Sequence, residues 1–162
     1  MTTLAVTGHM DLTNGTVSLV RAALEELLKG YEPGALVGVS CIAAGTDSLF
    51  AEAVLERGGR LVVVTPARDY RARKVKLQHA ELYDRLVEAA SEVVVMPFDT
   101  ASREAYEAAG KELLRRADRF VAVWDGVPMQ PGGHGGTAAT VTEARDAGLE
   151  VDVIWPEGAE RG

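Results

Sequence analysis

Short apolar runs rich in valine recur along the chain and are separated by longer segments with helical spacing. The runs span residues 4–6, 36–39, 61–64, 93–96, 120–124 and 151–155. They are mostly continuous rather than alternating, which is typical of parallel strands buried on both faces of a sheet. The pattern predicts six such strands.

The segments between the runs carry apolar residues at helical intervals. The first segment has a stripe at i, i+3, i+7, i+10 and i+11, formed by Val17, Val20, Leu24, Leu27 and Leu28. Shorter stripes follow the next runs and consist of Phe50, Val54 and Leu55, then Leu82, Leu86 and Ala89 or Ala90, then Tyr106, Ala109, Leu113 and Ala117. Each stripe predicts a helix that packs on the sheet.

Strands that alternate with helices predict a single-domain α/β fold of the Rossmann-like kind. We expect a three-layer sandwich, in which a mostly parallel six-stranded sheet carries helices on both faces. A chain of 162 residues is long enough for one domain with its own core. We assign this domain to residues 1–155 and expect residues 156–162 to fray, because they offer little to bury.

A glycine-rich segment follows the fifth apolar run. Gly133, Gly135 and Gly136 lead into Thr137 and a stretch with helical composition. Glycine lets backbone N–H groups approach an oxyanion, and a helix N-terminus adds unsatisfied donors. These four residues are therefore predicted to bind a phosphate or carboxylate; the alternative is a flexible loop with a threonine cap.

A second cluster, Gly45, Thr46 and Asp47, stands where the second helix is expected to begin. Its backbone can bind an anion, and the Asp47 carboxylate can accept a hydrogen bond from a ribose hydroxyl. The competing interpretation is that Thr46 or Asp47 merely caps the helix.

Two further clusters follow the first and fifth runs. Gly8 permits close approach at a strand end, and His9 can contact a ligand or act as a passive hydrogen-bonding residue. Asp125 stands where carboxylates contact ribose or act as general bases, although Asp125 and Gly126 also suit a tight turn. Since parallel strands end at one edge, these clusters are expected to surround one pocket.

Three acidic residues are candidates for catalysis: Asp47, Asp125 and Glu143. Glu143 lies six residues beyond Thr137, nearly two helical turns from the expected anion site. Cys41 has no histidine near it in the sequence, so we do not expect it to act as a nucleophile. The histidines lack metal-ligand spacing, so no metal is expected. We also expect no cofactor.

Charge and composition narrow the range of partners. The formal net charge of −7 argues against nucleic acid as the main partner. Basic residues do gather in one place and form a solvated helix face or an anion contact: Arg68, Arg71, Arg73, Lys74 and Lys76.

Cys41 is the single cysteine, and no apolar stretch suits a signal peptide or a membrane span. We expect a cytoplasmic protein.

The chain resembles the SLOG superfamily of Rossmann-like proteins, which includes LOG phosphoribohydrolases and the DNA-processing protein DprA. The resemblance covers nearly the whole chain and rests on Thr7-Gly8-His9 with Leu12, Ala44-Gly45-Thr46-Asp47 with Ala51, Tyr106 with Gly110, Ala117-Asp118, Ala122-Val123-Trp124-Asp125-Gly126, and Gly135-Gly136-Thr137-Ala138 with Val141 and Ala144-Arg145. It implies a nucleotide-like ligand whose phosphate contacts Gly135, Gly136 and Thr137, and it allows a homodimer.

One departure from the LOG pattern affects the expected chemistry. LOG enzymes carry a catalytic glutamate three residues after the threonine of their glycine motif, and Thr140 occupies that position here. We therefore expect a nucleotide-binding, sensing protein. The alternative is a LOG-like hydrolase that cleaves the N-glycosidic bond of a nucleoside 5′-monophosphate, and a DNA-handling role is a third hypothesis.

Overall fold

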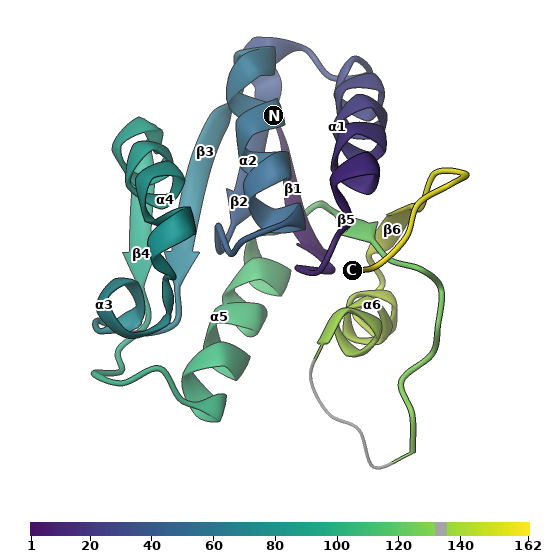
Figure 1. Ribbon diagram of the computed structural model, residues 1–162. Helices are drawn as coiled ribbons and strands as arrows, with labels where there is room; N and C mark the ends of the chain where they lie inside the picture. The colour runs from purple at the N-terminus through teal and green to yellow at the C-terminus, as the bar shows by residue number, and fades with distance from the viewer. Residues whose placement is uncertain (132–135) are drawn as a thin grey trace.

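The computed structural model describes residues 1–131 and 136–162, which form one α/β unit (Figure 1). Six strands make a single sheet in the order β4-β3-β2-β1-β5-β6. Their bounds are β1 Thr2–Gly8, β2 Leu36–Ser40, β3 Arg60–Thr65, β4 Glu92–Val95, β5 Arg119–Val123 and β6 Glu150–Ile154. Every neighbouring pair is parallel, which confirms the predicted Rossmann-like sheet.

Helices connect successive strands. They are α1 Asn14–Leu28, α2 Thr46–Arg57, α3 Tyr70–Lys74, α4 Leu77–Ala89, α5 Arg103–Arg116 and α6 Gly136–Asp146, with a short 3₁₀ turn, Pro33–Ala35, before β2. The sequence predicts one helix between β3 and β4, whereas the structure has two. The additional helix, α3, carries most of the basic run and ends where the backbone becomes extended at Val75.

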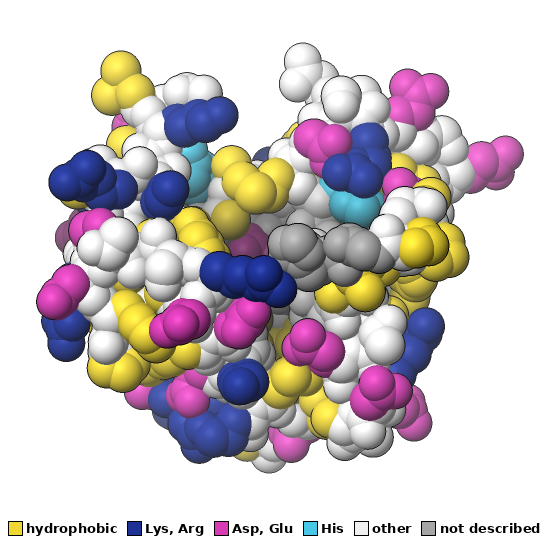
Figure 2. All heavy atoms as spheres, turned by 90° about the horizontal axis from the view of Figure 1, so that it is seen from below, with side chains coloured by type: hydrophobic (Ala, Val, Ile, Leu, Met, Phe, Trp, Pro, Cys, Tyr) yellow, Lys and Arg dark blue, Asp and Glu magenta, His cyan; other side chains and the backbone are white. Residues whose placement is uncertain are grey.

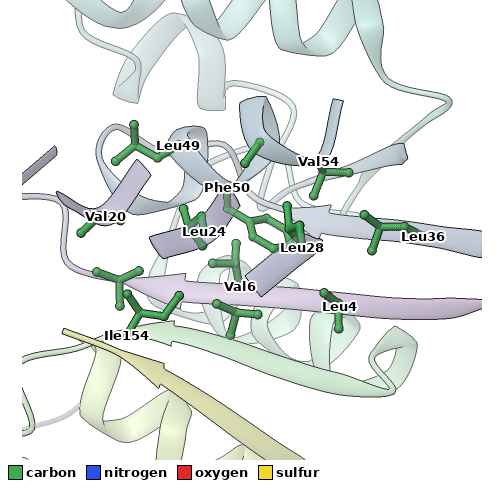
Figure 3. Close-up of a cluster of buried hydrophobic side chains, with 13 residues drawn as sticks. Leu4, Val6, Val20, Leu24, Leu28, Leu36, Leu49, Phe50, Val54 and Ile154 are labelled. Atoms are coloured by element: carbon green, nitrogen blue, oxygen red, sulfur yellow. The ribbon is translucent and has the colours of Figure 1, made fainter. Parts of the chain in front are cut away.

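The helices divide between the two faces of the sheet, as right-handed crossovers require. Helices α1, α2 and α4 cover one face, and α5 and α6 cover the other. The core under α1 and α2 contains Phe50, Leu4, Leu24 and Leu28, all of which are almost fully buried (Figure 3). These residues come from the predicted stripes and runs, so local periodicity accounts for the three-layer sandwich.

Strand β4 differs from the expectation of a strand buried on both faces. Val93 is 43% exposed and Val95 is 46% exposed. Strand β4 is the edge of the sheet, so one side of its backbone has no neighbouring strand. Valine content alone does not reveal this position, because the order of strands is a property of the whole fold.

The C-terminal segment is expected to fray, whereas the structure places it against the start of α1. The Thr16 hydroxyl donates to the Glu160 carbonyl at 3.0 Å and accepts from the Glu160 N–H at 2.7 Å. Leu12 and Arg161 form an isolated antiparallel bridge. These contacts are polar, and apolar patterning therefore gives no sign of them. No helix among the described residues is long and apolar enough to cross a membrane.

Candidate functional site

The strand order creates a switch point between β1 and β5. From β1 the chain proceeds outward through β2, β3 and β4, then returns to place β5 on the other side of β1. The helices that follow β1 and β5 therefore diverge and leave a crevice beyond the carboxyl ends of these strands. Ligands of open α/β sheets bind in such crevices.

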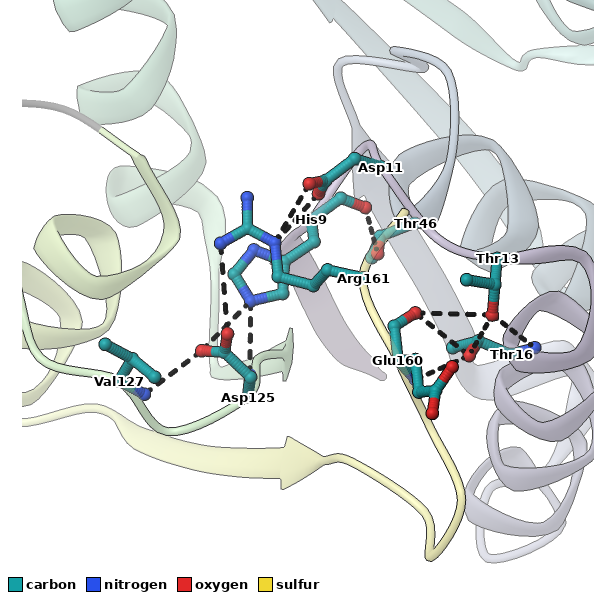
Figure 4. Close-up of polar contacts among 9 residues, drawn as sticks. All are labelled: His9, Asp11, Thr13, Thr16, Thr46, Asp125, Val127, Glu160 and Arg161. Atoms are coloured by element: carbon teal, nitrogen blue, oxygen red, sulfur yellow. Dashed lines mark hydrogen bonds and ion pairs between the residues drawn. The ribbon is translucent and has the colours of Figure 1, made fainter.

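Two side chains meet at this switch point, His9 after β1 and Asp125 after β5 (Figure 4). The Asp125 N–H donates to His9 Nε2 at 3.1 Å, and Nε2 lies 3.3 Å from Asp125 Oδ1. Acceptance by Nε2 fits a neutral ring with its hydrogen on Nδ1. His9 is buried and makes an edge contact with Trp155, with ring centroids 5.6 Å apart. The histidine thus joins the ends of two strands.

Asp125 is held as a carboxylate. Burial opposes its ionisation, but the hydrogen bond from the Val127 N–H and the positive charge of Arg161 act against burial, and the pKa of Asp125 is lowered. The Val127 N–H donates to Asp125 Oδ1 at 3.0 Å across Gly126, whose φ is +82°. Asp125 and Gly126 therefore form the turn that the sequence allows, and Asp125 Oδ2 is the oxygen left to face Arg161.

Arg161 brings a positive charge to this site from the C-terminal segment. Its Nε lies 2.9 Å from Asp11 Oδ1, and its Nη1 lies 3.8 Å from Asp125 Oδ2 (Figure 4). The pKa of Asp11 is lowered, chiefly by its hydrogen bond with Arg161. Neither residue is predicted from the sequence, because neither belongs to a motif and Arg161 stands in a segment expected to fray.

Helix α2 begins close against the end of β1. The Thr46 hydroxyl donates to the His9 carbonyl at 2.9 Å, and the Thr46 N–H donates to the same oxygen at 3.3 Å. A Cβ added to Gly8 would lie 2.4 Å from the Thr46 side chain, so only glycine allows this approach. Gly8, His9 and Thr46 therefore lie together.

The loop between β2 and α2 is held in an unusual conformation. Ile42 has a φ of +46°, a left-handed value that is rare for a β-branched residue. Ser40 Oγ accepts the Ile42 N–H at 3.0 Å, while His79 Nε2 and Ser48 Oγ bind the Ile42 carbonyl at 3.0 and 3.3 Å. Since a carbonyl only accepts, Nε2 carries the hydrogen in a neutral His79. Three side chains thus fix this loop.

Asp47 lies in the first turn of α2 and is partly buried. Loss of solvent raises the pKa of Asp47 to about 7, although hydrogen bonding from the Ala43 backbone opposes the increase. The carboxyl group can therefore exchange a proton near neutral pH, as a general acid or base must. Burial, with a smaller effect from Asp47, also raises the pKa of Cys41, so its thiol stays protonated.

The raised pKa of Asp47 predicts a pH-dependent stability. The folded state favours the neutral carboxyl, so Asp47 supports folding most at about pH 4 and loses this effect as the pH rises to about 7. Asp47→Asn cannot ionise. From about pH 4 to pH 8, the unfolding free energy of Asp47→Asn relative to wild type should rise by about 2 kcal/mol. Urea unfolding across this range measures the rise, and a difference that does not change with pH would contradict it.

The remaining predicted site residues belong to the segment before α6 and to α6 itself. Gly133 and Gly135 lie outside the residues that the structure describes. Gly136 is exposed, with a φ of +80°, and Thr137 is buried. Glu143 is exposed in the middle of α6, and no described contact joins it to the residues at the switch point.

Thr140 occupies the position of the LOG glutamate, and its hydroxyl donates to the Gly136 carbonyl at 3.2 Å, within its own helix. A hydroxyl in that bond does not replace a catalytic carboxylate. Within residues 1–131 and 136–162, no group of three or more histidine, cysteine or acidic side chains is arranged to hold a metal ion.

The basic run, residues 68–76, lies at the carboxyl edge of the sheet. Arg68 pairs with Asp99 at 2.8 Å, and Arg71 pairs with Asp84 at 2.7 Å. In Figure 2, which views the molecule from below, Lys and Arg side chains gather beside a histidine on one side, and a second histidine lies across a hollowed surface. The carboxyl edge therefore carries a group of basic side chains, of which Arg68 and Arg71 are paired with carboxylates.

Comparisons with known proteins identify the fold. No protein-family model and no curated protein matches the sequence. Among solved structures, DNA processing protein A (DprA) from Streptococcus pneumoniae is similar, with a TM-score of 0.72 and 18% identity over 98% of this chain and 52% of that chain. The protein TM1055 is similar with a TM-score of 0.57 and 19% identity, over 93% of this chain and 72% of that chain.

The molybdenum cofactor (Moco) carrier protein from Chlamydomonas reinhardtii is also similar, with a TM-score of 0.57 and 18% identity over 96% of this chain and 78% of that chain. The chain has the Rossmann-like fold of these proteins. It spans about half the length of the pneumococcal DprA chain. At these identities the likeness shows the fold, and the function must be argued from the site.

One expectation about partners is wrong. The net charge predicts that nucleic acid is an unlikely partner. DprA from Helicobacter pylori is also similar to this chain, with a TM-score of 0.70 and 14% identity over 99% of this chain and 68% of that chain. That protein has a single-stranded DNA binding mode. Net charge sums the whole surface, whereas a nucleic-acid strand responds to local potential. An overall charge of −7 therefore does not exclude this class of partner.

Proposed function

We propose that this protein binds a nucleotide or a nucleotide-derived ligand at the carboxyl edge of the sheet. The observation that carries the proposal is the pairing of His9 with Asp125 at the switch point between β1 and β5. A partly exposed carboxylate beside a buried imidazole suits the hydroxyl groups of a ribose, because an ionised carboxylate accepts strong hydrogen bonds.

Two helix starts and one arginine suit the phosphate of such a ligand. Helix α2 has no side-chain cap. Its first-turn N–H groups, at Asp47 and Ser48, are donors of the kind that bind anions. Arg161 adds a guanidinium next to Asp125. We assign Gly133, Gly135, Gly136 and Thr137 to a second phosphate contact at α6. A sensing role follows, since Thr140 replaces the carboxylate needed for LOG-type hydrolysis.

Binding should raise the melting temperature. At a ligand concentration about 100 times Kd, linkage stabilises the folded state by about 2.7 kcal/mol, which corresponds to roughly 5–10 °C for a chain of this size. We expect this shift with at least one nucleoside phosphate in a panel measured by differential scanning fluorimetry. Asp125→Asn should weaken that binding by about tenfold or more, because it removes the carboxylate charge.

The matched control is Asp146→Asn, which changes an exposed aspartate at the end of α6 and should leave the affinity unchanged. Indifference of the wild-type protein to every nucleotide, or equal affinity of Asp125→Asn and wild type, would overturn the proposal. Chromatography of the same mixtures separates binding from hydrolysis, since release of free base above background would indicate turnover.

Single-stranded DNA is a second candidate ligand. The likeness to DprA and the basic segment from Arg68 to Lys76 at the carboxyl edge favour it. Contacts to backbone phosphates release counterions, so affinity for a fluorescent oligonucleotide should fall steeply as salt increases. Absence of a salt-dependent change in anisotropy would remove this candidate without affecting the nucleotide proposal.

A further inference from the structure

A hollow of about 330 Å³ lies beside the β2–α2 loop; Met10 and Asp11 line part of it, and neither His9 nor Asp125 does. Its volume falls in the range of small-molecule sites. Met10, Tyr70 and Val75 supply apolar walls, and Lys74, Lys76 and His79 supply the basic groups. The hollow is thus a separate space at the same edge of the sheet.

Some basic side chains near this hollow have an ion-pair partner, and others have none among the described residues. Within residues 1–131 and 136–162, no carboxylate lies within ion-pair distance of Lys74 or Lys76, whereas Arg68 and Arg71 in the same run are both paired. Asp11, which also lines the hollow, is already paired with Arg161. Two ammonium groups therefore remain without a described counter-charge, which favours an anion in the hollow.

One wall of the hollow is rigid. His79 lines it and is held by its contact with the Ile42 carbonyl at 3.0 Å, and Ser48 Oγ lies 3.2 Å from the same ring nitrogen. The left-handed Ile42 places Ala43 and Ala44 on the adjoining wall. Sparsely populated backbone conformations persist where surrounding contacts over-determine them, and they concentrate at binding sites.

We propose that this hollow is a phosphate-ester subsite, in which Lys74 and Lys76 bind the phosphate and the apolar walls receive the attached base. The subsite rests on the proposed function, because it would hold a second phosphate ester beside the ligand that occupies the switch point. The same chemistry is offered by a free mononucleotide and by the phosphodiester of a short oligonucleotide. An aromatic base suits Met10, Tyr70 and Val75, since such surfaces stack or pack on planar rings.

Amide chemical shifts of isotope-labelled protein test this assignment. The probes are adenosine, 5′-AMP and the dinucleotide pApA, each titrated into wild type, the double variant Lys74→Ala/Lys76→Ala and the control Lys29→Ala/Lys111→Ala. The control removes two exposed lysines that do not line the hollow, one at the C-cap of α1 and one on α5. With 5′-AMP or pApA we expect shifts in residues 74–79 of wild type and control, and affinity about tenfold weaker in the double variant.

The outcomes separate the two proposals. Shifts around Gly8 and Asp125 without any in residues 74–79 would overturn the subsite and retain the proposed function. Shifts in residues 74–79 alone would retain the subsite and overturn the switch-point proposal. Equal binding of adenosine and 5′-AMP, or equal affinity of the double variant and wild type, would overturn a phosphate site. Tighter binding of pApA than of 5′-AMP would identify the phosphodiester as the source, and no shift with any probe would overturn both proposals.

Discussion

Replacing Gly45 with alanine is expected to lower the unfolding free energy by about 4 kcal/mol. The φ of Gly45 is +82° and its ψ is −131°, a combination that residues with a side chain rarely adopt. A Cβ at this position would lie 2.7 Å from the Met10 carbonyl oxygen and 2.9 Å from the His9 carbonyl oxygen. Backbone strain and overpacking against atoms that cannot rotate away each contribute on the order of 1–3 kcal/mol.

A second glycine separates these two contributions. Gly148 has the same φ of +82°, but an added Cβ would meet no atom within 4 Å. Gly148→Ala should therefore show mainly the cost of a left-handed alanine, about 1 kcal/mol. Urea denaturation of both variants measures the difference. Equal losses would mean that the close approach of α2 to the end of β1 contributes nothing to stability.

The effect of Gly45→Ala on binding follows from the same geometry. Gly45 precedes Thr46, whose hydroxyl and N–H both bind the His9 carbonyl. Displacement of this helix start would move His9 relative to Asp125. We therefore expect any variant that remains folded to lose nucleotide affinity, even though position 45 lies outside the His9–Asp125 pair.

Truncation of Phe50 should have a comparable effect on stability. Phe50→Ala is expected to reduce the unfolding free energy by about 3–5 kcal/mol, because it removes a fully buried ring and leaves a cavity. The ring lies in the core beneath α1 and α2, between Leu24, Val54 and neighbouring side chains (Figure 3). Chemical denaturation at constant pH measures the change.

Leu77→Ala is the control for Phe50→Ala. Leu77 is 91% exposed at the start of α4, so its truncation should change the unfolding free energy by less than about 0.5 kcal/mol. A loss of under about 1 kcal/mol for Phe50→Ala would contradict the assignment of this core cluster.

The helices illustrate what local sequence reveals. Val20, Leu24 and Leu28 are spaced by four residues and are all buried, because helical geometry places them on one side of α1. The same reasoning anticipates Phe50 and Val54 on α2. Such predictions need no knowledge of distant residues, since the helical period relates each position to its own neighbours.

The candidate site required more than local patterns. Gly8, His9, Gly45, Thr46 and Asp125 are identifiable from their places at the ends of apolar runs. Their contacts depend on β1 lying between β2 and β5. The roles of His79 and Arg161 were not predictable in this way, because each acts through polar contacts with segments far away in the sequence.

The six strands, the helical stripes and the α/β class can be predicted from the sequence alone, because they depend on hydrophobic periods that each segment contains. The edge position of β4, the place of the switch point and the pairing of the described charges depend on the tertiary structure. The C-terminal segment illustrates why. Its contacts with Asp11 and Thr16 join residues about 145 positions or more apart, and they are made by hydrogen bonds and ion pairs that leave no periodic signature.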